Sequence, residues 1–346
     1  MSPLQGKAFF LTGKKSLSLE TLQVEENDEQ VLIHVMRGGI CGSDIHYYYH
    51  GGNGNAVVRH PMLLGHEVIG RVEKAPTSSG LKKGMRVAVN PSLPCRHCEF
   101  CLSGQENHCL DMKFMGSAMR VPHVQGGFAE FISVEPERCI PYNPEASDQI
   151  MCFAEPLSVA LHAVNQAPSL IGKRVLISGA GPIGCLISLV AQASGATSVT
   201  AIDINATSRA MALKTGADAA YDPDSPEVET FKLAPGYFDV AFDASGAQPA
   251  IELAINALRP KGTFVQVGNS RGLMPFPVMT LLNKEINFKG SFRFAEEFET
   301  AVRWLEKGKI DPMPLLTGEM DSSQMQSAIE LAADKDKAAK IQLIFS

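Results

Sequence analysis

The sequence predicts an α/β protein of two domains, in which a doubly wound parallel sheet in the middle of the chain separates two parts of a β-rich domain. The length of 346 residues is enough for two hydrophobic cores. From residue 157 to 290, strand patterns alternate with helical patterns, whereas residues 1 to about 35 show the two-residue period of β-strands. We therefore expect a β-rich domain over residues 1–156 and 291–346 and a doubly wound domain over residues 157–290.

Composition narrows the class of protein. Apolar residues make up 45% and charged residues 20% of the chain, as in ordinary globular proteins. The net charge of −6 argues against a nucleic-acid partner, which would need a basic surface. No apolar run approaches the roughly 20 residues of a membrane span, and the first residues lack the pattern of a secretory signal. We expect a cytoplasmic protein that acts on a small molecule, with no nucleic-acid or membrane partner.

The doubly wound domain is predicted from apolar strands that are separated by helical stretches. The strands are expected at residues 174–178, 198–203, 238–243 and 262–268. Helical patterns cover residues 206–215 and 247–258, and a further helix follows residue 184. Because parallel neighbours need such crossover connections, the alternation predicts a parallel sheet covered by helices.

A glycine-rich turn links the first of these strands to its helix. Gly179, Gly181 and Gly184 have the Gly-x-Gly-x-x-Gly spacing. In this motif the first glycine makes a tight turn, the second allows close approach of a pyrophosphate and the third allows close helix packing. The helix start adds free N–H groups and the positive end of the helix dipole. Such turns also occur between buried elements, so the next strand is needed to support a dinucleotide site.

Asp203 ends that next strand, where a dinucleotide site needs a carboxylate for the adenosine ribose hydroxyls. The alternative is a buried strand–helix–strand unit with a capping aspartate. A carboxylate here repels the 2′-phosphate of NADP, so we expect NAD, although Arg209 is close enough in sequence to leave NADP possible. The residues that we expect to bind the cofactor are Gly179, Gly181, Pro182, Ile183, Gly184, Asp203 and Val267.

Four of the eight cysteines are clustered, with the spacing Cys-x2-Cys-x2-Cys-x7-Cys at Cys95, Cys98, Cys101 and Cys109. Four thiolates on a short lobe form the closed tetrahedral site that zinc takes in a structural role. The alternative is an iron–sulfur cluster, but its bacterial spacing continues with x3 and a Cys-Pro pair. Here the fourth cysteine lies farther on and is followed by Leu110, so the sequence favours zinc.

A second set of metal ligands is spread over two motifs before this lobe. Cys41, Ser43 and His46 are close together on a predicted turn and short helix, and His66 and Glu67 stand at the head of an apolar strand. The alternatives are a buried thiol for Cys41 and an ion pair for the other two ligands. A thiolate, an imidazole and a carboxylate suit a zinc ion that keeps one position open for water or substrate.

Glu155 offers a further carboxylate at the start of a predicted helix, directly before Pro156. The helix dipole favours an acid at this position without any other role. The functional alternative is a contribution to the open zinc site. The residues themselves leave both interpretations open, and they also leave open whether Glu67 or Glu155 ligates zinc directly.

Together these motifs resemble those of the zinc-containing medium-chain dehydrogenases, and the resemblance covers the whole chain. The matching patterns are Cys41-x-Ser43-x-x-His46, Gly65-His66-Glu67, the four clustered cysteines, and Gly179-x-Gly181-x-x-Gly184 with Asp203. Glu155 stands where the alcohol-dehydrogenase branch has a cysteine ligand, which indicates the polyol branch. Residues 37–48, 115–119, 122–124 and 290–294 are similar to those of branch members that oxidise the sugar acid L-idonate.

The resemblance implies a GroES-like catalytic domain, a Rossmann domain that binds NAD, one catalytic and one structural zinc, and a homodimer or homotetramer. It implies catalytic zinc at Cys41, His66 and Glu67, with Glu155 near the fourth position. Ser43 is implied to pass the substrate proton outward and His46 to relay it to solvent. The alternatives for these two residues are a helix cap and a solvent-facing imidazole. The implied reaction is oxidation of L-idonate at carbon 5 to 5-keto-D-gluconate.

Arg293 is the expected contact to the substrate, because a guanidinium can grip a carboxylate or a diol in a bidentate manner. The alternative is an ion pair with Glu296 or Glu297. The rival substrates are sorbitol and xylitol, with the same fold and mechanism. A non-catalytic NAD-binding sensor is the rival from another class, and intact ligands for an open zinc site argue against it.

Overall fold

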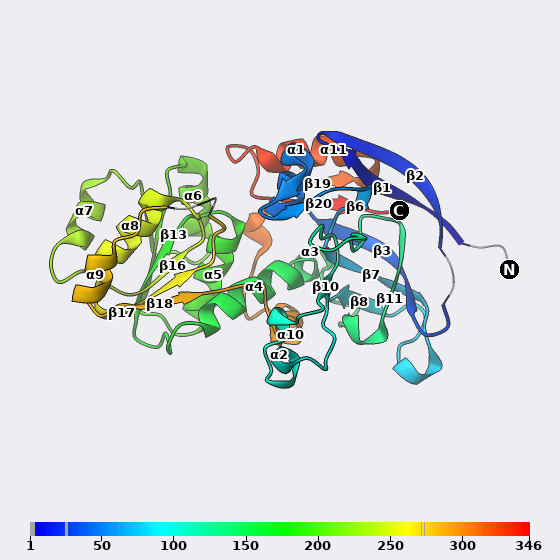
Figure 1. The fold of residues 1–346 in the computed structure, drawn as a ribbon, viewed down its shortest axis with the longest axis horizontal. Coiled ribbons are helices and arrows are strands. Elements are labelled where there is room, and N and C mark those ends of the chain that lie inside the picture. Colours follow the sequence, from blue (N-terminus) through cyan, green and yellow to red (C-terminus); the bar gives the residue numbers. More distant parts are fainter. Residues whose placement is uncertain (1–3, 25–26, 271, 273) are drawn as a thin grey trace. The chain divides into compact units, whose positions relative to one another are not determined.

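The computed structural model describes residues 4–24, 27–270, 272 and 274–346. The chain forms two compact units. The first contains the described residues up to Glu155 together with Phe298–Gly308 and Leu316–Ser346, and the second contains Pro156–Glu297 and Lys309–Leu315. The first unit is rich in strands, and the second surrounds a parallel sheet with helices (Figure 1). Among the described residues, no helix has both the length and the apolar character that crossing a membrane requires.

The first unit is built around two sheets. Its described residues form a three-stranded antiparallel sheet of β2 (Ser16–Val24), β1 (Leu4–Gly13) and β6 (Met62–Leu63), in that order. They also form a seven-stranded sheet in the order β12-β8-β7-β3-β20-β19, with β11 paired to β3. Its strands are β3 (Val31–Gly39), β7 (Glu67–Lys74), β8 (Arg86–Val89), β11 (Phe131–Val134), β12 (Cys139–Pro141), β19 (Leu316–Asp321) and β20 (Lys340–Ile344).

Shorter elements complete this unit. Two ribbons pair β4 (Gly52–Asn53) with β5 (Ala56–Val57) and β9 (Ser92–Leu93) with β10 (Lys113–Phe114). The helices are α1 (Gly42–His50), α2 (Glu99–Leu102), α3 (Asp148–Met151), α11 (Met325–Ala333) and nearly all of α10 (Glu297–Glu306). Single 3-10 turns cover Thr77–Ser79, Glu106–His108, Pro136–Arg138 and Ser322–Gln324.

The seven-stranded sheet brings distant parts of the chain together. β20 lies between β3 and β19 and pairs antiparallel with β3, so that Gln342 is opposite Gly39. In β3, Ile33 and Val35 are fully buried, as expected for β-branched residues on the inner face of a sheet. The C-terminal strand therefore runs beside the segment that leads into Cys41.

The described residues of the second unit form a six-stranded parallel sheet in the order β15-β14-β13-β16-β17-β18. Its strands are β13 (Arg174–Ser178), β14 (Ser198–Ile202), β15 (Ala219–Tyr221), β16 (Phe238–Asp243), β17 (Leu258–Gln266) and β18 (Asn287–Gly290). Its helices are α5 (Pro182–Ala193), α6 (Ala206–Lys214), α7 (Pro226–Lys232), α8 (Gln248–Ala257), α9 (Val278–Asn283) and most of α4 (Ala154–Asn165), with a 3-10 turn at Met313–Leu315. The strand order reverses between β13 and β16, the point where doubly wound sheets bind ligands. The predicted α/β fold class is confirmed.

The strand bounds agree with the prediction to within one residue for β13, β14, which ends at Ile202 rather than at residue 203, and β16, but not for β17. The expected bounds of β13 and β16 are those observed. β17 begins at Leu258 rather than at residue 262, because Leu258 already pairs with Phe238 before an irregularity in the register. Lys261 has a left-handed conformation there, with φ of 66°. Because this left-handed residue lies within the strand, the sequence pattern did not show that the strand begins at Leu258.

Candidate active site

The first metal-ligand cluster begins at the N-terminus of α1, where Cys41 is the N-cap. Asp44 on this helix is fully buried, and its Oδ2 accepts the backbone N–H of Cys41 at 2.9 Å. Its Oδ1 accepts the backbone N–H of Gly65, directly before His66, at 3.2 Å. Burial raises the pKa of Asp44, although His66 and the two N–H groups oppose this effect. Asp44, which was not among the predicted site residues, thus fixes the backbone beside two ligands.

Cys41, His66 and Glu67 present ligand atoms that all lie within 4.8 Å of one another. His66 is 5% exposed, and among the described residues its Nδ1 has no hydrogen-bond partner; Asp44 Oδ1 is 3.8 Å away. Burial disfavours the imidazolium, yet the charges of Cys41 and Asp44 raise the pKa of His66 well above its usual value. A buried ring nitrogen without a partner, next to a thiol and a carboxylate, is satisfied by a cation. The three side chains therefore fit zinc.

Lys340 supplies a positive charge to this cluster from β20. Its Nζ donates to both carboxylate oxygens of Glu67 at 2.8 Å and to the carbonyl of Ile40 at 3.1 Å. Lys340 is 4% exposed and Glu67 is 1% exposed. Burial lowers the pKa of Lys340, but the charges of Glu67 and Cys41 raise it above its usual value overall. Lys340 was not predicted, and its one sequence signal is a lysine at the head of an apolar strand pattern.

Glu155 lies in the first turn of α4 and is buried, with 6% of its surface exposed. Burial raises its pKa to about 7, an effect that His66 opposes and Glu67 reinforces. Among the described residues, the group of ligand atoms within 4.8 Å contains Glu67 and not Glu155. Glu155 is therefore a carboxyl group near the cluster that can exchange a proton at neutral pH.

Ser43 and His46 lie on α1 and are both partly exposed. Their spacing of three residues places them on the same side of the helix. The His46 ring stacks on that of His50, with 5.7 Å between centroids. The helix is held by the buried Tyr47, whose hydroxyl accepts the backbone N–H of Ala118 at 3.2 Å. Both predicted proton-carrying residues thus share an anchored helix with Cys41.

The four-cysteine lobe forms the second metal-ligand cluster. The sulfur atoms of Cys95, Cys98, Cys101 and Cys109 all lie within 4.8 Å of one another. The sulfur of Cys109 accepts the backbone N–H of Cys95 at 3.1 Å. Backbone N–H groups of Cys101 and Leu110 lower the pKa of Cys98 to about 6, so this thiol is ready to ionise at neutral pH. Burial and the hydrogen bond with Cys98 raise the pKa of Cys101 to about 12. Four cysteine ligands without a carboxylate or water position suit a closed structural zinc site.

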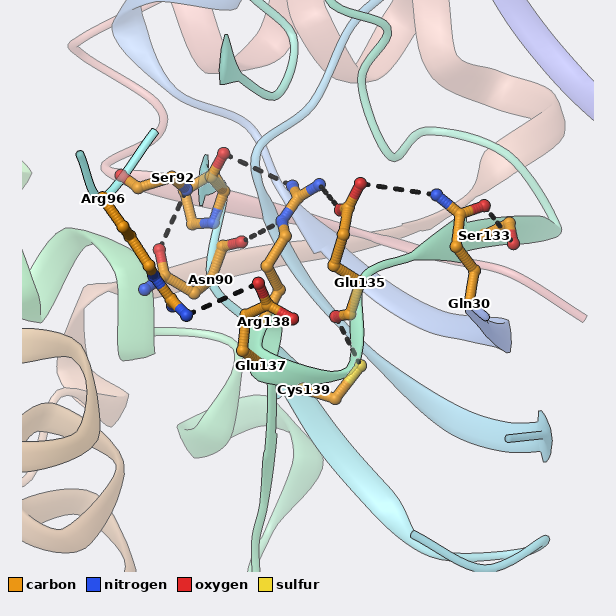
Figure 2. A network of polar contacts seen from close by, with 10 residues as sticks. Gln30, Asn90, Ser92, Arg96, Ser133, Glu135, Glu137, Arg138 and Cys139 are labelled. Atoms are coloured by element: carbon orange, nitrogen blue, oxygen red, sulfur yellow. Dashed lines mark hydrogen bonds and ion pairs between the residues drawn. The ribbon is translucent and has the colours of Figure 1, made fainter. Parts of the chain in front are cut away.

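Arg138 anchors the base of this lobe. β9 and β10 pair where the chain enters and leaves the lobe, and Arg138 binds the segment just before β9. Its Nε donates to the carbonyl of Asn90 at 2.8 Å and its Nη2 to the carbonyl of Pro91 at 3.3 Å. Its Nη1 donates to Glu135 at 3.2 Å, so that the guanidinium lies between Asn90 and Glu135 (Figure 2). Burial lowers the pKa of Arg138, although Glu135 opposes this effect.

The glycine turn of the second unit joins β13 to α5. Gly179 has φ of 93°, and a Cβ there would lie 2.8 Å from the backbone nitrogen of Ser245. A Cβ at Gly184 would lie 1.9 Å from the carbonyl oxygen of Gly179, so both positions require glycine. A Cβ at Gly181 would meet nothing within 4 Å, and Pro182 follows as the first residue of α5. The helix start is therefore open to a ligand, as a pyrophosphate site requires.

Asp203 lies directly after β14 and is partly exposed. Its Oδ2 accepts the backbone N–H of Ala180 in the glycine turn at 2.7 Å. Its Oδ1 accepts the backbone N–H of Asn205 at 2.8 Å. The carboxylate is thus held against the turn, at the carboxyl edge of the sheet where a dinucleotide ribose is bound.

Val267 directly follows β17, and its backbone N–H donates to the carbonyl of Asp243 at 2.9 Å. Asp243 is fully buried at the end of β16. Its carboxylate accepts hydrogen bonds from Ser245 Oγ at 2.6 Å, Gly246 N–H at 2.8 Å and Gln266 Nε2 at 2.7 Å. Asp243 was not predicted, and it braces the two strand ends beside the switch point.

Arg293 follows β18 and has φ of 54°. Its guanidinium lies over the ring of Phe292, 5.0 Å from the centroid. Glu297, one of the two alternative partners considered for Arg293, accepts hydrogen bonds from His162 at 2.9 Å and from Asn165 at 3.0 Å. These bonds and one from a backbone N–H hold the pKa of Glu297 at about 2, although burial acts in the opposite direction.

An open metal site in one unit and a dinucleotide turn in the other define a metal-dependent dehydrogenase. Family comparisons agree with this class. The alcohol dehydrogenase GroES-like domain matches residues 27–144, and the zinc-binding dehydrogenase domain matches residues 182–307. The chain belongs to the zinc-binding dehydrogenases, and the enzyme class expected from the sequence is confirmed.

Individual relatives indicate the branch of the family to which the chain belongs. The chain is 45% identical over 335 residues to L-idonate 5-dehydrogenase (NAD(P)(+)) of Escherichia coli K12, covering 97% of each protein. It is 37% identical to D-xylulose reductase A of Aspergillus niger over 337 residues, covering 94% of this chain and 93% of the relative. The crystal structure of L-idonate 5-dehydrogenase from Escherichia coli K-12 superposes with a TM-score of 0.97 at 44% identity, covering 99% of each chain. The protein is therefore a dehydrogenase of the polyol and sugar-acid branch.

Proposed function

We propose that the protein oxidises L-idonate at carbon 5 to 5-keto-D-gluconate with reduction of NAD, and that it also catalyses the reverse reaction. The observation that supports this type of reaction is the cluster of the partly exposed Cys41 with the buried His66 and Glu67, in which the unpartnered His66 Nδ1 suits a divalent cation. The similarity to L-idonate 5-dehydrogenase supports the choice of substrate.

Cys41, His66 and Glu67 would hold the catalytic zinc, with Glu155 near the fourth position. The four cysteines of the lobe would hold the structural zinc. At the open site, zinc supplies a Lewis acid that lowers the pKa of the substrate hydroxyl. Lys340 orients the Glu67 carboxylate, because it binds both of its oxygens.

The proton leaves through α1 in this proposal. Ser43 accepts it from the substrate hydroxyl, and His46 on the same side of the helix relays it to solvent. Glu155 is the third catalytic group, because a carboxyl with a pKa of about 7 can take up or release a proton at neutral pH. The partial exposure of Ser43 and His46 supports the assigned direction, from the buried cluster outward.

The hydride passes to NAD bound at the glycine turn. The proposed binding residues are Gly179, Gly181, Pro182, Ile183, Gly184, Asp203 and Val267. The Asp203 carboxylate accepts hydrogen bonds from the ribose hydroxyls and repels a 2′-phosphate. We therefore propose NAD as the preferred cofactor and NADP as the weaker one.

Arg293 binds the carboxylate or the hydroxyls of the sugar acid in this proposal. A guanidinium pairs with a carboxylate through two parallel hydrogen bonds, which a lysine cannot do. Its position over the Phe292 ring restricts the guanidinium and so lowers the entropy lost on binding.

We also propose a homodimer or homotetramer. β18 is an edge strand of the parallel sheet and exposes Phe288, and the neighbouring α9 exposes Val278, Met279 and Leu282. An apolar edge strand pairs readily with a second copy of the chain. Sedimentation velocity tests this proposal, since Phe288→Lys should reduce the assembled fraction.

The substrate is tested by the rate of NADH formation on L-idonate, sorbitol, xylitol and D-gluconate. A site that pairs the Arg293 guanidinium with a carboxylate should reject a polyol without one by about 10⁴-fold in kcat/KM. A preference for xylitol or sorbitol would support the alternative function, a polyol dehydrogenase, to which the similarity to D-xylulose reductase A points. Arg293→Ala should remove the preference for L-idonate while leaving zinc content unchanged.

A further inference from the structure

Arg209 on α6 is held at the ends of two neighbouring strands. Its Nη1 lies 2.8 Å from the carbonyl oxygen of Asp203, 3.0 Å from that of Ile204 and 2.8 Å from Oδ2 of Asp222. The Arg209 side chain is 23% exposed and the Asp222 side chain is 41% exposed. The ion pair is therefore within reach of a ligand from solvent.

This pair lies at the carboxyl edge of the sheet. β14 and β15 are parallel neighbours, with Ile202 opposite Tyr221, and Asp222 directly follows β15. The backbone N–H of Asp203 donates to the carbonyl of Tyr221 at 3.2 Å, which joins the two strand ends. Asp203 is the carboxylate proposed to bind the adenosine ribose. Arg209 and Asp222 therefore stand beside the ribose position.

NADP differs from NAD by a phosphate on this ribose. Arginine is the side chain best suited to bind it, because its terminal nitrogens pair with two phosphate oxygens. Arg209 has one of those nitrogens bound to two carbonyls and to the Asp222 carboxylate. Asp222 also cancels the charge that would attract the phosphate, so the repulsion from Asp203 is left unopposed.

We propose that Asp222 is a specificity-determining residue that lowers the affinity for NADP by holding and neutralising Arg209. This inference rests on the proposed binding of the dinucleotide at Asp203. It assigns the preference for NAD to two carboxylates, of which only Asp203 was expected from the sequence to bind the cofactor.

Asp222→Asn is a sharp test, because asparagine removes the charge and keeps the local turn. Oδ1 of Asp222 accepts the backbone N–H of Asp224 at 3.1 Å, and an asparagine oxygen can do the same. Asp224 is exposed and two residues away, so Asp224→Asn is a control with the same change in net charge. Arg209→Gln combined with Asp222→Asn tests whether any gain depends on Arg209.

The dissociation constants of NADPH and NADH are measured by isothermal titration calorimetry on the zinc-loaded full chain, without substrate. Asp222→Asn should tighten NADPH binding about fivefold, change NADH binding less than about twofold, and lose this gain at high salt. Asp224→Asn should have no such effect, and the double variant should lose the gain. An unchanged NADPH/NADH ratio, an equal gain in Asp224→Asn, or a gain that survives Arg209→Gln would overturn the inference. If the unmodified protein bound neither nucleotide, the proposed function would fail, and the inference with it.

Discussion

The two metal-ligand clusters of the first unit are built in opposite ways. The four-cysteine lobe takes its ligands from residues 95–109, and Cys95 and Cys98 are partly exposed. The other cluster takes its ligands from two separate segments, which supply Cys41 and the adjacent pair His66 and Glu67. Its counter-charge, Lys340, lies 273 positions beyond Glu67 and is buried with it.

This difference follows from solvation. Four thiolates carry more negative charge than a divalent ion balances, and water near a partly exposed lobe stabilises the excess. The Glu67 carboxylate of the other cluster is 1% exposed and has no such water around it, so it needs a fixed cation from the protein. A closed surface site can therefore be local in sequence, whereas an open buried site depends on the tertiary structure around it.

Replacing Lys340 with methionine should have the largest effect, because it leaves the buried Glu67 carboxylate without its counter-charge. Removing one partner of a buried ion pair costs about 3–5 kcal/mol of unfolding free energy. We expect this loss in the zinc-free protein and a smaller loss with zinc, since the metal cation then compensates Glu67. Urea unfolding with and without zinc measures both values.

Lys335→Met is the matched control, because Lys335 is exposed and lies shortly before the same strand. It should change the unfolding free energy by less than about 0.5 kcal/mol. Equal destabilisation by the two variants would contradict the role assigned to Lys340.

The same difference between the two clusters determines which of their residues could be predicted from the sequence. The cysteine spacing is enough to place the lobe, because all of its ligands lie within one short segment. Cys41, His66 and Glu67 could be chosen by residue type and motif. Lys340 and Asp44 could not, because their partners depend on the pairing of β20 with β3 and on the packing of α1 against residue 65.

The fold of the second unit was more accessible to prediction than the site it carries. Apolar strands and a glycine turn have local signals, and β13 and β16 have the predicted bounds. Asp243 and Asp222 lack such signals, because an aspartate at a strand end looks the same whether it braces a neighbouring strand or holds an arginine. Only the strand order brings each one to its partner.

The next largest effect is expected in the pH dependence of stability, through Glu155 near the cluster of Cys41, His66 and Glu67. Burial raises the pKa of Glu155 to about 7, whereas the unfolded value is near 4.5. Between these pH values the folded state keeps a proton that the unfolded state has released, so stability falls as pH rises, by up to about 3 kcal/mol. Urea unfolding of the zinc-free protein from pH 4.5 to 7 measures this loss.

Glu155→Gln is the control for this titration, since the amide keeps the shape and does not ionise. The variant should lose less stability than the unmodified protein as pH rises through the same window. The same slope in both proteins would mean that another buried group is responsible.

Arg138→Met should weaken the attachment of the lobe by a smaller amount. The variant leaves the carbonyls of Asn90 and Pro91 without their buried donor, which costs about 1–3 kcal/mol. We expect faster transfer of the lobe zinc to a colorimetric chelator, with the zinc of the other cluster released at its usual rate. Arg86→Met is the control, because Arg86 also donates to a carbonyl in this unit, that of Pro144, at 2.9 Å. Equal acceleration in both variants would indicate general loosening rather than a specific anchor.

Glu137→Gln should have the smallest effect, although Glu137 also connects to the lobe. Arg96 Nη1 lies 3.6 Å from Glu137 Oε1, and the two side chains are 55% and 41% exposed (Figure 2). Exposed pairs of this kind contribute about 0–1 kcal/mol and are screened by salt. We expect zinc release from the lobe at the unmodified rate in both low and high salt. If Glu137→Gln released zinc as fast as Arg138→Met at low salt, the lobe would be held by surface charge. The contrast between a self-contained lobe on a buried anchor and a cluster that needs a buried counter-charge would then no longer hold.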